Sequence, residues 1–138
     1  MVGFNFLNSG ARDNVFPLAL EHGVGTQIMH AVRRALSHED VLLATVEKLK
    51  ESGEIDPQDF NNADPLDFLK ESDDVLSVVE AAYRYCRHEP GVSVVLTGTG
   101  SVEHLASNVA ALLKAPLSES IHQSIDAIFG QVRSISGD

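Results

Sequence analysis

The segment at residues 92–108, VSVVLTGTGSVEHLASN, constrains the fold more than any other part of this sequence. It begins with an apolar, β-branched run, passes through a Gly-Thr-Gly turn, and ends in a helical pattern whose first turn Ser101 can cap. A strand that ends in glycines and leads directly into a helix forms an anion site, because free backbone N–H groups and the positive end of the helix dipole attract a phosphate. The segment therefore predicts a strand, a phosphate-binding loop and a helix.

Two further apolar runs predict strands at residues 2–7 and 25–30, in addition to the one at 92–97. Helical patterns separate and follow them, at residues 14–22, 39–52, 73–88, 102–113 and 118–132. This alternation favours an α/β fold of parallel strands joined by right-handed crossovers, with helices on the outer side of the sheet. Residues 1–138 are expected to form a single domain.

Polar residues ahead of the helical patterns suggest where the helices begin. Asp13 or Asn14 is expected to cap the first helix, with Pro17 tolerated in its first turn. Ser37 opens a pattern that resembles a capping box, and Ser72 is expected to cap the helix at 73–88.

Composition excludes several classes of protein. The formal net charge of −10 argues against nucleic acid and anionic membranes as partners, and no apolar run approaches the length of a membrane span. The single cysteine, Cys86, excludes an internal disulfide and fits a reducing compartment, so a cytoplasmic location is expected, with no signal peptide. The six histidines lack the spacing of a metal site, so no metal is expected.

Several segments resemble the aldo/keto reductase family, in the order of that family. FNFLNSGARDNVFPLALEHGVG resembles its sixth strand, the following helix and the entry to the seventh strand. TQIMHAVRRAL resembles the seventh strand and its cofactor loop, and AAYRYCRHEPGVSVVLTGTGSVEHLASN resembles the last core helix, the eighth strand and the nucleotide phosphate site. The resemblance implies a partial TIM (β/α)8 barrel, namely its C-terminal portion with strands six to eight. The first five strands, with the catalytic Asp, Tyr, Lys and His, are expected to have no counterpart, so no catalytic residue is assigned here.

The resemblance also implies a site for NADP or NAD. The cofactor-binding residues expected from it are Gly98, Thr99, Gly100, Ser101, His104, Ser107, Asn108 and Arg33. Many members of the family have Lys or Arg where Gly98, Gly100 or His104 stands, so the choice between NADP and NAD stays open. Arg33 or Arg34 could supply the missing charge, or both could be solvated loop residues.

The function implied is that of the C-terminal portion of an NAD(P)H-dependent oxidoreductase of carbonyl or sugar substrates. The chain would contact the phosphate and adenine of the nicotinamide cofactor, and a small carbonyl substrate would bind only in a complete barrel. Two alternatives stay open. One is a non-catalytic module that associates with itself through its open sheet edges, and the other is a simple nucleotide- or anion-binding domain.

A three-stranded piece of a barrel is also expected to expose the face that would line the barrel. The candidates for this inner face are Phe4, Phe6, Ile28 and Val94, whichever of each alternating set points inward. Such exposure predicts a homo-oligomer or a missing N-terminal segment. Tyr83 and Tyr85 are expected on an outer helix, where neither could act as the acid of a carbonyl reduction.

Overall fold

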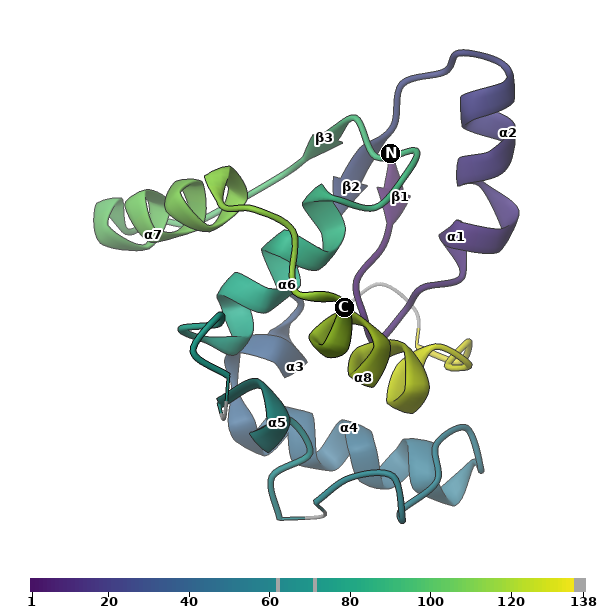
Figure 1. Cartoon of the computed structure of the whole chain (residues 1–138), viewed down its shortest axis with the longest axis vertical. Helices are drawn as coiled ribbons and strands as arrows, with labels where there is room; N and C mark the ends of the chain where they lie inside the picture. Colours follow the sequence, from purple (N-terminus) through teal and green to yellow (C-terminus); the bar gives the residue numbers. More distant parts are fainter. Residues whose placement is uncertain (62, 71, 136–138) are drawn as a thin grey trace.

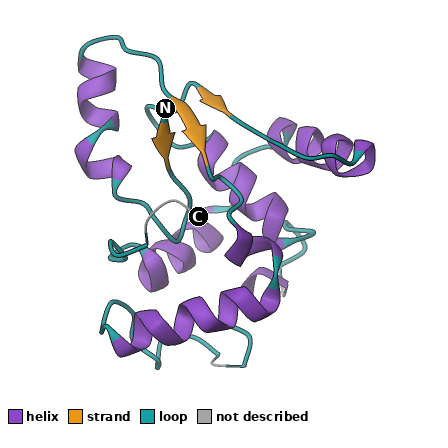
Figure 2. Ribbon diagram, turned by 180° about the vertical axis from the view of Figure 1, so that it is seen from behind, coloured by secondary structure: helices purple, strands orange, loops and turns teal. Residues whose placement is uncertain are grey.

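The computed structural model describes residues 1–61, 63–70 and 72–135 and shows an α/β fold with one three-stranded parallel sheet (Figures 1 and 2). The strands lie in the order β1-β2-β3, and both pairs are parallel. This confirms the predicted fold class. In chain order the elements are β1 (Val2–Gly3), α1 (Ala11–Asn14), α2 (Phe16–Glu21), β2 (Gln27–Met29), α3 (Arg34–Ser37), α4 (Glu39–Glu51), α5 (Asp67–Lys70), α6 (Val78–Arg87), β3 (Val94–Val95), α7 (Val102–Leu113) and α8 (Glu119–Phe129).

The strands are shorter than the runs at 2–7, 25–30 and 92–97 predict. After β1 the backbone turns back on itself, because Asn5 and Asn8 exchange backbone hydrogen bonds of 3.1 and 2.9 Å. The side chain of Asn5 also donates to the carbonyl oxygen of His30 at 2.8 Å, and His30 ends β2 with a positive φ of 60°. These local bonds end the regular pairing where apolar content alone would continue it.

The predicted helix at 14–22 corresponds to α2, a separate short helix α1 precedes it, and neither Asp13 nor Asn14 caps a helix. Pro17 lies in the first turn of α2. Because proline has no backbone N–H to donate to residue 13, the break between α1 and α2 falls where that hydrogen bond would be missing.

Two other helix starts also differ from the prediction. Helix α6 begins at Val78, where Ser77 accepts a hydrogen bond from the N–H of Glu80 at 3.1 Å, so the predicted cap at Ser72 is wrong. The residue that precedes α4 is His38, without a side-chain cap, so the capping box at Ser37 is also wrong. Helices α4 and α7 match the ranges 39–52 and 102–113 within one residue, and α8 is shorter than 118–132.

One face of the sheet is covered by helices. Phe4 and Ile28 are fully buried, and the ring of Phe4 lies 5.0 Å from that of Phe16 in α2 and 5.6 Å from that of Tyr85 in α6. Phe6 is also buried and packs against Tyr85. The expectation that Phe4, Phe6 or Ile28 lies on an exposed inner face is therefore wrong, because these residues form the contact between the sheet and its helices.

The other face of the sheet is open. Residues paired across parallel strands point to the same side, so Gln27 of β2 and Val94 of β3 share this face. Gln27 is exposed, Val94 is 45% exposed, and Leu96 just after β3 is 41% exposed. Of the expected inner-face residues, only Val94 is found there.

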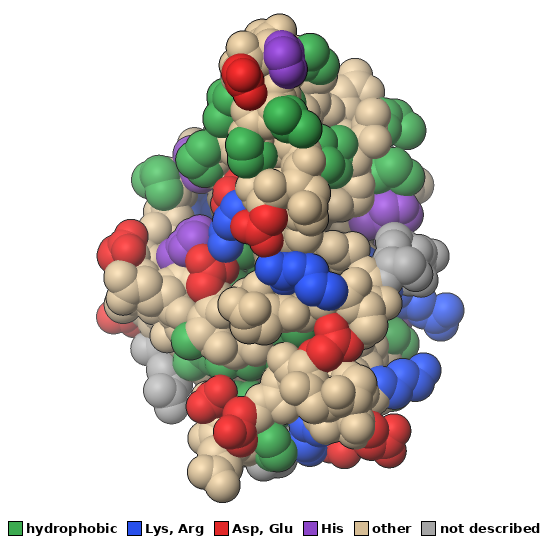
Figure 3. All heavy atoms as spheres, turned by 90° about the vertical axis from the view of Figure 1, so that its right-hand side faces the viewer, with side chains coloured by type: hydrophobic (Ala, Val, Ile, Leu, Met, Phe, Trp, Pro, Cys, Tyr) green, Lys and Arg blue, Asp and Glu red, His purple; other side chains and the backbone are tan. Residues whose placement is uncertain are grey.

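Further apolar side chains are exposed beside both edge strands. Helix α7, which follows β3, extends away from the rest of the molecule and leaves Val102 and Leu113 more than 80% exposed (Figure 1). Helix α2, which follows β1, exposes Leu18 and Leu20, and hydrophobic side chains gather over it in Figure 3. Apolar exposure is thus concentrated on the two sides of the sheet where no further strand is paired.

Arg84 holds the segment after α7 against α6. Its guanidinium is 2% exposed and donates to the carbonyl oxygens of Asp74, Ala115 and Pro116 at 2.6–2.9 Å. It also pairs with the carboxylates of Asp74 and Glu80 at 2.9 and 3.1 Å. The Arg84 guanidinium, through this hydrogen bond, lowers the pKa of Asp74. This buried cation fixes the segment that follows α7.

Candidate functional site

The loop before α7 is organised by its own hydroxyl groups. The Oγ1 atom of Thr99 accepts a hydrogen bond from the N–H of Ser101 at 3.1 Å, and the Oγ atom of Ser101 accepts one from the N–H of His104 at 3.3 Å. The predicted cap at Ser101 is therefore confirmed. Each hydroxyl still has its hydrogen to donate, so Thr99 and Ser101 could both support the loop and donate to an anion.

A cavity of about 600 Å³ lies beside this loop and joins it to the segment after β2 and to α6. The loop and α7 contribute five of the expected cofactor-binding residues: Gly98, Thr99, His104, Ser107 and Asn108. The opposite wall includes Val32, His38, Ser77 and Tyr83. The fold thus brings the two loops that follow neighbouring strands β2 and β3 to one cavity, as expected at the carboxyl ends of parallel strands.

Three of the expected residues are not among the described residues that line this cavity. Gly100 and Ser101 belong to the loop, but they lie outside the lining, and Arg33 is a buried residue immediately before α3. Arg34 is exposed in the first turn of α3. Neither arginine therefore contributes to the cavity wall in the described part of the chain.

A buried hydrogen-bonded group forms the floor of the site. The Oγ1 atom of Thr97, just after β3, lies 2.8 Å from the hydroxyl of Tyr83 and accepts a hydrogen bond from the Nδ2 atom of Asn108 at 2.8 Å. Tyr83 and Asn108 are 4% and 8% exposed. The amide of Asn108 is thereby oriented, with its Oδ1 atom still able to accept a hydrogen bond.

His38, Ser77 and Tyr83 are site residues that the sequence pattern does not reveal. They lie between 21 and 66 positions from His104 along the chain. His38 immediately precedes α4, whereas Ser77 caps α6 and Tyr83 lies within it. Tyr83 lies on an outer helix, as predicted, but its side chain reaches the cavity wall. To predict this from the sequence, one would have to know that α6 packs beside the end of β3.

The glycines of the loop are not required by the fold. A Cβ atom added at Gly98 or Gly100 would meet no heavy atom within 4 Å, and neither residue has a positive φ. Gly91, by contrast, has a φ of +94°, and an added Cβ would come within 2.6 Å of the Cβ of Phe16. The open space at Gly98 and Gly100 leaves the backbone accessible to a ligand.

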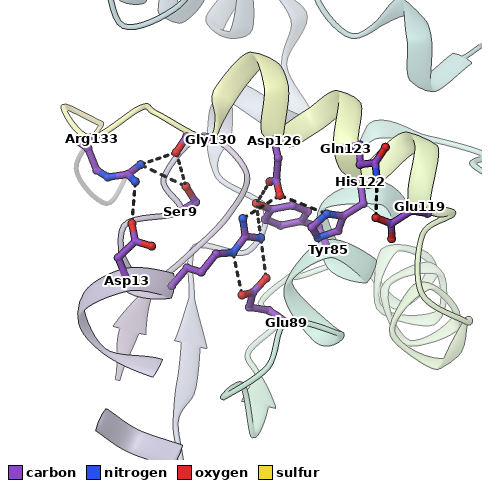
Figure 4. Close-up of polar contacts among 11 residues, drawn as sticks. Ser9, Asp13, Tyr85, Glu89, Glu119, His122, Gln123, Asp126, Gly130 and Arg133 are labelled. Atoms are coloured by element: carbon purple, nitrogen blue, oxygen red, sulfur yellow. Dashed lines mark hydrogen bonds and ion pairs between the residues drawn. The ribbon is translucent and has the colours of Figure 1, made fainter. Parts of the chain in front are cut away.

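A second polar cluster lies outside this cavity, between α1, α6 and α8 (Figure 4). Arg12 binds both carboxylate oxygens of Glu89 at 2.7 and 2.9 Å and one oxygen of Asp126 at 3.0 Å. The hydroxyl of Tyr85 donates to Asp126 at 2.8 Å, and the His122 ring stacks on Tyr85 at 5.1 Å. The hydrogen bonds with Glu89 raise the pKa of Arg12, and burial raises the pKa of Tyr85. The cluster joins the helices and keeps Tyr85 protonated.

Cys86 is buried and is no candidate nucleophile. The Sγ atom of Cys86 donates to the carbonyl oxygen of Phe4 at 3.3 Å, and burial raises the pKa of its thiol, which makes it a poor nucleophile. No group of three or more His, Cys, Asp or Glu side chains suited to a metal occurs among the described residues. In the same part of the chain, no helix is long and apolar enough to cross a membrane.

These features define an α/β protein with a glycine loop ahead of a helix at the end of a parallel strand. The family model for the aldo/keto reductase family matches residues 1–129, and the chain belongs to this family. A search of curated proteins found no match.

Solved structures show the same fold. The aldo-keto reductase AKR11C1 from Bacillus halodurans, in its apo form, is 24% identical with a TM-score of 0.58 over 96% of this chain. Its holo form is 23% identical with the same TM-score over 97% of this chain. The present chain spans 45–46% of the AKR11C1 chain, so it matches less than half of that structure.

Proposed function

We propose that this chain is the C-terminal portion, with strands six to eight, of an NAD(P)H-dependent aldo/keto reductase barrel, and that it binds the phosphate and adenine end of NADP or NAD. The cavity beside α7 is the observation that carries the proposal. It combines an accessible glycine backbone, the capped N-terminus of a 12-residue helix, and the buried amide of Asn108. An anion and an aromatic base require this combination of donors and buried surface.

Each part of the cavity has a distinct role in this proposal. The backbone at Gly98 and Thr99 and the first turn of α7 bind phosphate, with the Ser101 hydroxyl supporting the turn. Ser107 and Asn108, further along α7, contact the ribose and adenine. When bound, the nicotinamide cofactor would supply the hydride for a carbonyl or sugar substrate in a complete barrel. The net charge of −10 and the single buried cysteine support a cytoplasmic protein that binds neither nucleic acid nor membranes.

Calorimetric titration of the chain with NADP and NAD tests the proposal. Gly98→Val should weaken binding at least tenfold, because the added side chain occupies the space through which a phosphate approaches the backbone. Gly3→Val is the matched control, since a Cβ at Gly3 also meets no heavy atom within 4 Å but lies far from the loop, in β1. Equal affinities for the two variants, or no binding of either nucleotide to the unaltered chain, would contradict the proposal.

The chain by itself should reduce no aldehyde or ketone with NADH or NADPH above background. Hydride transfer needs a substrate held against the nicotinamide and an acid at its oxygen. The hydroxyl of Tyr85 is hydrogen-bonded to Arg12 and Asp126, and that of Tyr83 is hydrogen-bonded to Thr97. Both hydroxyls therefore already have partners within the chain. Turnover that disappears in Tyr83→Phe or Tyr85→Phe would show that the chain contains its own active site.

A second candidate function is self-association through the open sheet face and edges. Val94 and Leu96 are 45% and 41% exposed on that face, and Val102 is 85% exposed on α7. Covering a few hundred Å² of such surface contributes several kcal/mol at about 25 cal/mol per Å². Sedimentation velocity should show a dimer or larger species that dissociates in Val94→Lys/Leu96→Lys. A monomer at micromolar concentration would exclude this candidate without affecting the nucleotide site.

A further inference from the structure

The cavity beside α7 has an unusual balance of charge. The described residues that line it include no Lys, Arg, Asp or Glu, and its two groups able to carry a positive charge near neutral pH are His38 and His104. They come from separate elements, since His38 immediately precedes α4 and His104 lies in the first turn of α7. Any charge that this wall offers to a phosphate therefore comes from imidazole.

The contacts of His38 leave one of its ring nitrogens available to a ligand. The Oγ atom of Ser37 lies 3.0 Å from the Nδ1 atom of His38 and 3.2 Å from the carbonyl oxygen of Arg34. When the Ser37 hydroxyl donates to that carbonyl, its oxygen accepts from a protonated Nδ1 atom. The Nε2 atom of His38, which forms no hydrogen bond with the described residues, is then a free donor.

Charged groups near His38 lie in a neighbouring cavity of about 270 Å³. Glu39, Asp64 and Lys70 line it together with His38, and Lys70 pairs with Asp64. That pair is compensated internally, and Glu39 is the neighbour of His38 in the chain. No described Asp or Glu forms an ion pair with His38 itself.

His104 is placed where a proton and an anion stabilise each other. Glu103 precedes it in the first turn of α7, and Tyr83, whose hydroxyl is hydrogen-bonded to Thr97, lines the same cavity. A positive charge in the first turn of a helix is unfavourable when no anion is near, whereas a phosphate there is favourable. Binding of a phosphate should therefore be accompanied by uptake of a proton.

We propose that His38 and His104 together recognise a phosphate group of the bound nucleotide, and that they do so in their protonated form. This inference rests on the proposed nucleotide site and adds its regulation by pH. Histidine changes charge between about pH 5 and 8. The affinity for nucleotide should therefore fall about tenfold from pH 6 to pH 8. A phosphomonoester becomes more negative over the same interval, with a second ionisation near pH 6, so the ligand alone would change affinity in the opposite direction.

The test is calorimetric titration with NADP and with NAD at pH 6 and pH 8 and constant ionic strength. His38→Gln and His104→Gln should each reduce the pH dependence, and the double variant should abolish it. His104→Arg should bind more tightly at pH 8 than the unaltered chain, because its charge is permanent. His22→Gln is the matched control, since His22 is an exposed histidine after α2, outside the cavity.

The two ligands separate the possible sources of the phosphate. A pH dependence seen with NADP alone assigns the histidines to the 2′-phosphate, and one seen with both ligands assigns them to the pyrophosphate. Binding that is equal at pH 6 and pH 8, or a pH dependence that persists in the double variant, overturns this inference and leaves the nucleotide site intact. Absence of binding at both pH values overturns the nucleotide site as well.

Discussion

The polar cluster around Arg12, between α1, α6 and α8, and the cavity beside α7 use polar residues in opposite ways. In the cluster, Arg12 carries a full charge, and Glu89 and Asp126 bind it directly. In the cavity, the described lining has no permanently charged side chain. The Nε2 atom of His38 and the Oδ1 atom of Asn108 remain available for hydrogen bonds to a ligand. A buried group whose hydrogen bonds are all satisfied inside the chain fixes the structure, whereas a group with spare hydrogen-bonding capacity can bind something else. The contrast separates the structural cluster from the candidate site.

The largest expected effect is loss of Arg12. Arg12→Leu leaves the carboxylate of Glu89, which is 6% exposed, without its cation, so the free energy of unfolding should fall by about 3 kcal/mol. Urea denaturation monitored by circular dichroism measures it. Arg87→Leu is the control on exposed surface of α6 and should change stability by less than about 0.5 kcal/mol. If both variants lose the same stability, the cluster is not structural.

Gly91 and Gly98 test the same contrast between a residue that the fold requires and one that is left open to a ligand. Gly91→Ala should cost about 2 kcal/mol, because the new Cβ would come within 2.6 Å of Phe16 at a φ of +94°. Gly98→Ala should change the unfolding free energy by less than about 0.5 kcal/mol, since its Cβ enters open space. Thermal melts of the two variants provide the measurement. A large loss for Gly98→Ala would mean that the loop glycine serves the fold and not a ligand.

The two tyrosines allow the same comparison through variants that each remove a single hydroxyl oxygen. Tyr85→Phe removes the hydroxyl shared by Arg12 and Asp126 and should cost about 1.5 kcal/mol. Tyr83→Phe should cost about 0.5 kcal/mol, because Thr97 keeps its hydrogen bond from Asn108. The order of the two urea midpoints checks this prediction, and a reversed order would place the structural network at the cavity instead.

The smallest expected effect depends on pH. Hydrogen bonds from the N–H groups of Arg133 and Ser134 lower the pKa of Glu54 from 4.5 to about 2. A carboxyl group whose pKa is lower in the folded state stabilises the fold above its unfolded pKa, and this stabilisation is lost as the pH falls toward 2. Glu54→Gln should therefore reduce stability at pH 6 by less than about 1 kcal/mol, since the carboxyl is largely in water. The difference from the unaltered chain should shrink between pH 4.5 and pH 2, and one that stays constant would contradict the assignment.

Local sequence determined the helix and loop at the candidate site. The range 102–113, the cap at Ser101 and the glycine turn all follow from residues adjacent in the chain, and all three are found. The same local reasoning placed Pro17 correctly in a first turn but failed for the caps at Asp13 or Asn14 and at Ser72. The helix that contains Pro17 begins after Val15, which makes no side-chain cap, and the hydroxyl of Ser72 accepts the N–H of Asp74 in a turn that precedes α6. Competing local hydrogen bonds decide between such alternatives, and composition does not show which one prevails.

The sequence by itself determined the fold class and the strand, loop and helix that form one wall of the cavity, because these depend on apolar periodicity and short-range capping. The family followed from the resemblance of several segments in family order, and the family model matches residues 1–129. Only the tertiary structure decided which face of the sheet Phe4 and Ile28 occupy, and that His38 and Tyr83 complete the cavity. The alternation along a strand shows that two faces exist, but not which of them the helices cover. The packing of α6 against the sheet settles that choice, since it joins residues far apart in the chain.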